Sequence, residues 1–166
     1  MRCSQAKEAR PCCQENLLPY IDGSLLVPRF VPELAGTLEE AGRLPSPRVL
    51  FIGSGGNQYT PRRLRVAGQR LYKSERGRLG EAYVLGSPEA RVRLRWIEEH
   101  GIPLPIDNLF ERIDRDCGVA MYWLEPPIVE QGSKNGRFRS VLEPAPPNMI
   151  RRMTSLLQKV RRKYFY

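Results

Sequence analysis

Basic side chains gather between residues 61 and 78, where seven arginines and lysines accompany a single acid, Glu75. Guanidinium groups bind phosphate oxygens through paired hydrogen bonds, and ammonium groups attract the same oxygens as point charges. Tyr59 and Tyr72 lie beside these cations, and aromatic rings can stack on bases. The stretch therefore predicts contact with nucleic acid. The alternative is a basic surface that only faces solvent. The residues predicted to make the contact are Arg62, Arg63, Arg65, Lys73, Arg76 and Arg78.

A glycine cluster at residues 53–56 follows an apolar run and precedes these cations. Backbone N–H groups at such a point can cradle a phosphate. The Lys-Ser/Thr pair that completes a phosphate-binding P-loop does not follow the glycines, so the sequence contains no Walker motif. We therefore interpret residues 53–56 as a flexible hairpin tip.

Three carboxylates are the candidates for catalysis. Glu111 and Asp114 lie three residues apart on an expected helix, and Asp116 lies just beyond them. Such a group could bind Mg²⁺, which stabilises the charge that develops when a phosphodiester is cleaved. The alternative is a solvated helix face on which these acids pair with Arg112 and Arg115.

Histidine and cysteine give little support for other chemistry. The single histidine, His100, stands at an expected helix C-terminus, where the helix dipole favours a cation, so we interpret it as a cap. The four cysteines include no C-x-x-C pair, and one histidine adds too few ligands to predict zinc. We expect free thiols and a cytoplasmic protein. The sequence contains no run of about 18 apolar residues, so we expect no membrane span, and we expect no secretory signal.

The overall charge points to a polyanionic partner. The chain has 166 residues, a net charge of +9 and a pI of about 9.8. This length suits one domain, and this charge suits nucleic acid or an anionic membrane surface. Residues 61–95 carry ten basic and three acidic side chains, whereas residues 98–116 carry two basic and six acidic ones.

Apolar periodicity and turn residues predict helices alternating with short strands. We expect helices at 32–41, 87–99 and 107–115, on the evidence of proline, serine and acidic residues at their starts and glycines after the first two. We expect strands at 49–52, 64–72, 81–85 and 119–124. Glycines between 74 and 80 predict a hairpin that joins 64–72 to 81–85, and Asn135-Gly136 predicts a second between 128–131 and 137–142.

The last segment predicts an amphipathic helix. Its apolar residues recur at helical spacing and form one stripe, made of Met149, Ile150, Met153, Leu156, Leu157, Val160 and Tyr164. Basic residues occupy the remaining surface. We expect the stripe to pack on the domain or a partner subunit rather than to lie on a membrane.

These elements predict an α/β domain with a small mixed sheet, helices and a docked C-terminal helix. We divide the chain into a loose lead-in at 1–19, the α/β domain at 20–143 and the basic amphipathic helix at 144–166.

The order of elements before the cations resembles the ParB/sulfiredoxin fold. Members of that fold run from a helix and a glycine into a strand, and then through a small apolar pair into a Gly-Glu-Arg-Arg type motif. Here the helix that includes Glu33, then Gly42, the strand at 49–52 and the segment 66–70 follow this order. In that family the motif holds nucleotide phosphates, so the resemblance implies phosphate binding by Gly68, Gln69 and Arg70, with ATP and Mg²⁺ as cofactors. Gln69 stands where the family has an acid, and Leu71 stands where it has a second arginine.

The size and arginine-rich composition also resemble fertility inhibition proteins of that fold. Those proteins block conjugative transfer and are linked to DNA cleavage and ATP hydrolysis. The resemblance implies a DNA-binding protein, a candidate deoxyribonuclease with NTPase activity, whose partners are DNA and the conjugation or secretion machinery. Two other functions remain open from the residues alone. One is a non-enzymatic protein that blocks a partner through its basic surface and C-terminal helix, and the other is a basic RNA-binding module.

Overall fold

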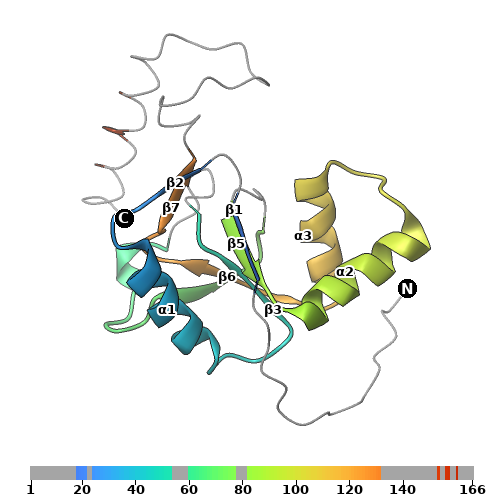
Figure 1. The fold of residues 1–166 in the computed structure, drawn as a ribbon, viewed down its shortest axis with the longest axis horizontal. Coiled ribbons are helices and arrows are strands. Elements are labelled where there is room, and N and C mark those ends of the chain that lie inside the picture. The colour runs from blue at the N-terminus through green and yellow to red at the C-terminus, as the bar shows by residue number, and fades with distance from the viewer. Residues whose placement is uncertain are drawn as a thin grey trace.

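The computed structural model describes residues 18–21, 24–53, 60–77 and 82–131, together with positions 153, 156, 157 and 160. Along the chain the elements are β1 (Leu18–Ile21), β2 (Ser24–Leu26), α1 (Phe30–Ala41), β3 (Arg48–Phe51), the 3-10 helix η2 (Arg62–Leu64), β4 (Leu71–Ser74), β5 (Ala82–Leu85), α2 (Ser87–His100), α3 (Ile106–Asp116), β6 (Ala120–Leu124) and β7 (Val129–Gln131). Figure 1 shows their arrangement.

A five-stranded sheet forms the centre of the described chain, with strand order β1-β5-β3-β6-β4. The β3–β6 pair is parallel, and the other neighbours are antiparallel. A second, two-stranded sheet joins β2 to β7. The predicted α/β class with a small mixed sheet is therefore confirmed, and the likeness to the ParB/sulfiredoxin fold stays a prediction.

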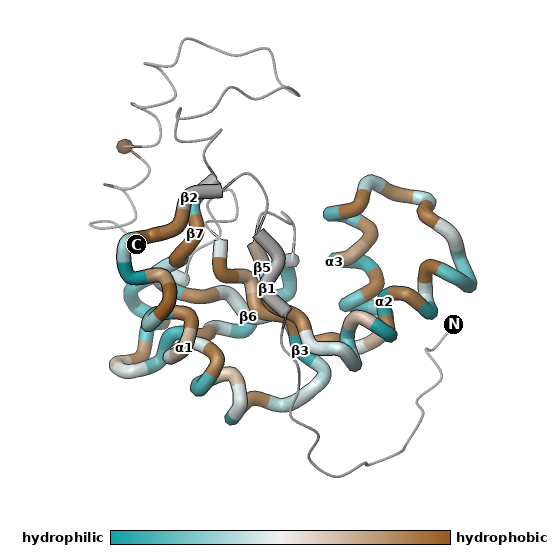
Figure 2. Tube along the Cα trace, in the orientation of Figure 1, coloured by the Kyte–Doolittle hydropathy of each residue, from teal (hydrophilic) through white to brown (hydrophobic). Residues whose placement is uncertain are grey.

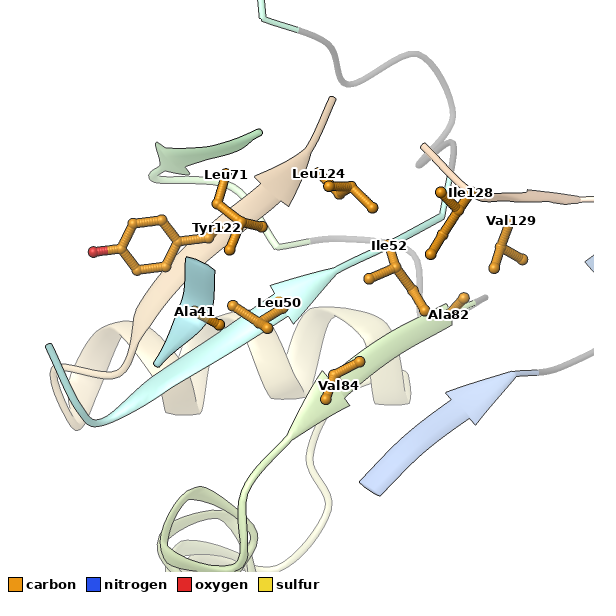
Figure 3. Packing of buried hydrophobic residues seen from close by; sticks show 10 residues of the cluster. All are labelled: Ala41, Leu50, Ile52, Leu71, Ala82, Val84, Tyr122, Leu124, Ile128 and Val129. Atoms are coloured by element: carbon orange, nitrogen blue, oxygen red, sulfur yellow. The ribbon is translucent and has the colours of Figure 1, made fainter. Parts of the chain in front are cut away.

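Helices cover both faces of the sheet (Figure 1). On one face Leu50 and Tyr122 pack with Ala41 of α1, as the cluster in Figure 3 shows. On the other face Phe51 and Trp123 stack with ring centroids 4.7 Å apart, under α2 and α3. Each fully buried aliphatic side chain contributes about 1.5–3 kcal/mol to stability. Figure 2 shows that the helices alternate between hydrophobic and hydrophilic residues along the chain.

The three predicted helices are confirmed, with ends that differ by one or two residues. α1 begins two residues before Pro32, which is tolerated in the first turn because N–H groups there have no intrahelical partner. α2 begins at Ser87 and ends before Gly101, whose φ of 71° glycine adopts without strain. α3 begins at Ile106, so Asp107 lies in its first turn instead of capping it.

The strand predicted at 64–72 and its hairpin to 81–85 are wrong. Residues 62–64 form a 3-10 helix, and a turn follows in which Gly68 has a φ of 82°. The strand begins only at Leu71 and pairs with β6, about 50 residues later, while β5 pairs with β1 and β3. β3 and β6 therefore lie between β5 and β4 in the sheet, and the pattern of local turn residues does not reveal such a separation.

The other predicted hairpin falls partly outside the described residues. Its first arm is β7, which pairs with β2 from the start of the chain. Its second arm at 137–142 and its Asn135-Gly136 turn lie outside the described residues, as do residues 1–17 of the lead-in predicted at 1–19 and residues 54–56 of the glycine cluster.

Four positions of the C-terminal helix are described, and all four are helical. Their side chains, Met153, Leu156, Leu157 and Val160, are 41–63% exposed. Packing of this helix on the domain stays a prediction. Within the described part of the chain, no helix combines the length and apolarity that crossing a membrane requires.

Candidate nucleic-acid interface

The basic residues of 60–77 divide into exposed cations and cations held by carboxylates. Arg62 and Arg63 lie on η2, and Lys73 and Arg76 lie on or after the edge strand β4. All four are exposed and form no ion pair with another residue that the structure describes. Their positive charges are therefore available to a partner.

Arg65 is engaged within the chain. The strand predicted at 64–72 included it, but Arg65 instead follows the 3-10 helix and turns inward. Its Nη2 lies 3.1 Å from Oε1 of Glu125, and its Nε donates to the Thr60 carbonyl at 2.7 Å. The Thr60 N–H donates to the other oxygen of Glu125 at 3.2 Å. Arg65 thus fastens the segment before η2 to the end of β6.

The structure brings Gly68, Gln69 and Arg70 together in one turn that leads into β4. Gln69 is exposed, and its Nε2 donates to the Leu71 carbonyl at 2.8 Å. The guanidinium of Arg70 forms an ion pair with Glu33 of α1. These side chains therefore face acceptors of the chain itself, and Gln69 caps the outer edge of β4.

Glu40 of α1 completes the contacts of this turn. Its carboxylate accepts the N–H of Arg70 at 3.1 Å from both oxygens, and the N–H of Leu71 at 3.0 Å. Glu33 was interpreted in the sequence only as a favourable charge at the helix start, and Glu40 carried no prediction. The signal that could have found them is their spacing of seven, which places two acids on one face of a helix.

Tyr72 anchors the same turn. Its hydroxyl accepts the Val66 N–H at 3.0 Å and donates to the Gln69 carbonyl at 3.1 Å. The hydroxyl is thus used for the turn, and the predicted stacking of Tyr72 on a base stays a prediction. Tyr59 and Arg78 lie outside the described residues.

Arg76 has a fixed backbone and an exposed side chain. Its carbonyl accepts the indole N–H of Trp123 at 2.8 Å, and its own N–H donates to Oγ of Ser74 at 3.1 Å. These bonds hold the guanidinium at the end of the edge strand, where it faces solvent.

The three candidate catalytic carboxylates each bind an arginine. Asp116 lies 3.5 Å from Nε of Arg112, and Glu111 lies 2.7 Å from Nη2 of Arg115. Both pairs follow the predicted helix-face pairing. Glu111 is buried rather than solvated, however, and also accepts the Gly77 N–H at 3.3 Å. Among the described residues, no three His, Cys, Asp or Glu side chains group in a way that could hold a metal ion.

Asp114 is fully buried in a bidentate pair with Arg93 of α2, with Nε–Oδ1 and Nη2–Oδ2 distances of 2.9 and 2.6 Å. Burial raises the pKa of Asp114 above 3.8, and the hydrogen bonds and charge of Arg93 offset this only in part. Sequence reasoning missed the pair. Glu89, Arg93 and Trp96 share one helical face, so an inward Trp96 was the available signal.

The remaining polar groups have structural partners. Buried Glu89 accepts the backbone N–H of Arg48 at 2.9 Å and the hydroxyl of Ser46 at 3.1 Å. His100 stacks on Trp96 with centroids 4.3 Å apart, and its Nδ1 lies 2.9 Å from the Trp96 carbonyl. This contact agrees with the predicted capping role at the end of α2.

Comparisons with protein-family models, with curated proteins and with solved structures gave no match. The resemblance to the ParB/sulfiredoxin fold therefore rests on the sequence pattern alone.

Proposed function

We propose that the protein binds nucleic acid, DNA in the first instance, through a basic edge made of Arg62, Arg63, Lys73 and Arg76. The observation that carries the proposal is the contrast within residues 60–77. These four cations are exposed and form no ion pair with described residues, whereas Arg65 and Arg70 are paired.

The chemistry of the basic edge suits phosphate contact. A nucleic acid that meets these cations releases counterions, which gives affinity without a need for base recognition. The net charge of +9 adds a long-range attraction for the same partner.

Three further activities stay predictions from the family resemblance. They are cleavage of DNA, use of ATP and Mg²⁺, and inhibition of conjugative transfer through a partner in the secretion machinery. In the structure Glu111, Asp114 and Asp116 already bind arginines. The proposal is therefore one of binding.

Fluorescence anisotropy of labelled double-stranded and single-stranded DNA across a salt series tests the proposal. For wild type, log affinity should fall linearly with log salt. The double variant Arg62→Ala/Arg63→Ala should bind more weakly and show a slope smaller by roughly two, about one for each lost phosphate contact.

The matched control is Arg91→Ala/Arg95→Ala, which removes two exposed cations from α2 and lowers the net charge equally. Equal losses in both double variants would contradict a localised basic edge and leave only a general charge effect. Competition with RNA separates DNA binding from the RNA-binding alternative.

A second function, binding of a protein partner, is favoured by the four exposed apolar side chains at helical positions 153, 156, 157 and 160. A chain that lacks residues 148–166 should then retain DNA binding and lose the partner. If the truncated chain still bound both DNA and the partner, this second function would be contradicted.

A further inference from the structure

Two aliphatic side chains face solvent within the basic stretch. Leu64 ends η2, Val66 follows two residues later, and both are 59% exposed. Arg65, which lies between them, turns inward to its ion pair with Glu125. Single exposed apolar residues are common on protein surfaces, whereas here two of them flank an anchored arginine. We call Leu64 and Val66 the apolar pair.

Hydrogen bonds fix the backbone on both sides of the apolar pair. The Leu64 N–H donates to the Pro61 carbonyl at 2.8 Å, and the Val66 N–H donates to the Tyr72 hydroxyl at 3.0 Å. The Val66 carbonyl accepts the Gln69 N–H at 3.1 Å and so closes the turn that follows. These bonds hold two aliphatic side chains in water, where burial against a partner would be favourable. A surface that is already formed also loses little conformational entropy when it binds.

Cations lie on both sides of the apolar pair along the chain. Arg62 and Arg63 precede it in η2, and Lys73 follows it in β4. The hydrogen bond from Val66 to the Tyr72 hydroxyl brings the turn beside β4. Phosphate contacts and apolar contacts are therefore available on the same part of the surface.

A ligand that fits this combination carries both phosphates and accessible apolar faces. Single-stranded nucleic acid does, because its bases can be unstacked and packed on side chains, whereas a duplex keeps its base faces stacked inside. We propose that the apolar pair packs against unpaired bases of a single strand whose phosphates contact the basic edge. This inference rests on the proposed function and names the form of nucleic acid that the same surface prefers.

An anionic membrane surface also combines negative charge with apolar groups, but the apolar pair is too small to suit it. Leu64 and Val66 together carry fewer apolar carbons than one myristoyl chain, which by itself anchors a protein only marginally. A nucleobase needs a contact surface of only one or two side chains. The size of the apolar pair therefore favours bases over lipid.

Fluorescence anisotropy with a labelled single strand of about 12 nucleotides tests the inference. A second strand of the same length carries abasic sites, so it has phosphates without bases. Wild type should bind the strand with bases roughly tenfold more tightly than the abasic strand, and Leu64→Ser/Val66→Ser should lose this preference. The salt slope of this variant should match wild type, because no phosphate contact is removed. Leu64→Ile/Val66→Ile should keep the preference.

The control variant is Val31→Ser/Ile102→Ser, which removes two aliphatic side chains that are 75% and 68% exposed outside the basic stretch. An unchanged base preference in Leu64→Ser/Val66→Ser, or an equal loss in this control, would overturn the inference. An equal loss of affinity for a duplex of the same length would overturn it too. So would a loss confined to vesicles of phosphatidylserine and phosphatidylcholine. Urea unfolding verifies that each variant stays folded.

The apolar pair and the basic edge can fail separately. Arg62→Ala/Arg63→Ala should lower the salt slope and keep the preference for the strand with bases. A lower slope in this variant, together with an unchanged base preference in Leu64→Ser/Val66→Ser, rejects only the apolar pair. Loss of the preference in Leu64→Ser/Val66→Ser, together with a wild-type slope in Arg62→Ala/Arg63→Ala, rejects only the basic edge.

Discussion

Arg93 of α2 and Asp114 of α3 form a bidentate ion pair beneath the surface, with their side chains 5% and 0% exposed. The guanidinium also lies 4.4 Å from the ring centroid of Phe110 and 5.4 Å from that of Tyr83. One arginine thus joins two helices and the face of the sheet. Because charge and hydrogen-bonding capacity are satisfied together, the pair is tolerated in an apolar environment.

Asp114→Ala should destabilise the domain by about 3–5 kcal/mol, because it leaves the Arg93 charge buried without a partner. Urea unfolding followed by circular dichroism measures this loss. Asp116→Ala is the control, since it removes an acid two residues away from an exposed pair with Arg112. It should cost no more than about 1 kcal/mol. Similar losses in both variants would show that the buried pair does not tie the helices together.

The same pair predicts a pH dependence. Burial raises the pKa of Asp114 above 3.8, so the folded chain binds more protons here than the unfolded chain. The contribution of Asp114 to the free energy of unfolding should therefore fall as pH rises from 3.8 through the folded pKa, and then level off. Subtracting the urea-unfolding profile of Asp114→Asn isolates this contribution. If the difference in unfolding free energy between wild type and Asp114→Asn rose with pH in this interval, the charge of Arg93 would outweigh burial in its effect on the pKa of Asp114.

Gly36→Ala should reveal the contact between α1 and Arg70. Alanine in a helix interior is favoured over glycine by about 1 kcal/mol, but its Cβ would stand 2.8 Å from Nη1 of Arg70. In the wild-type background this gain in stability should be reduced or lost, because the Arg70 guanidinium must move to make room for the Cβ. In the Arg70→Ala background the full gain should appear.

A double-mutant cycle on urea-unfolding free energies measures this coupling between positions 36 and 70. Gly42→Ala supplies the comparison, because the nearest atom to a Cβ at Gly42 would be the backbone carbonyl oxygen of Glu39, in its own helix, at 3.4 Å. A coupling energy near zero would contradict the contact.

Local signals predicted most of the elements. α2 could be located from Pro88 in its first turn and Gly101 after its end, because proline and glycine act on the first and last turns of a helix alone. The N-cap position is Gly86, and Ser87 is the first helical residue. Strand pairing could not be predicted in the same way. β4 pairs with β6 rather than with β5, and this pairing depends on packing between segments about 50 residues apart in the sequence.

The candidate site shows the same division. The density of basic residues identified the stretch, yet it did not separate exposed Arg62 from paired Arg65 and Arg70. Their partners, Glu125 and Glu33, are distant in sequence, and each contact requires the folded sheet or helix to bring it close. Arg93 was missed for a related reason, since arginine is seldom buried unless a partner neutralises it.

Gly77→Ala should destabilise the end of the β4 segment. Gly77 is buried, and a Cβ there would stand 2.5 Å from Sδ of Met121 and 3.0 Å from Cζ of Phe51. Met121 is flexible, but Phe51 is held in its stack with Trp123, so the added methyl group overpacks the site. We expect a loss of about 1–3 kcal/mol in urea unfolding. Substituting Leu for Met121 would leave the crowding unrelieved, whereas Met121→Ala in the Gly77→Ala background should recover part of the loss. If Gly77→Ala matched Gly42→Ala in stability, the close packing of Gly77 against β3 and β6 would be refuted.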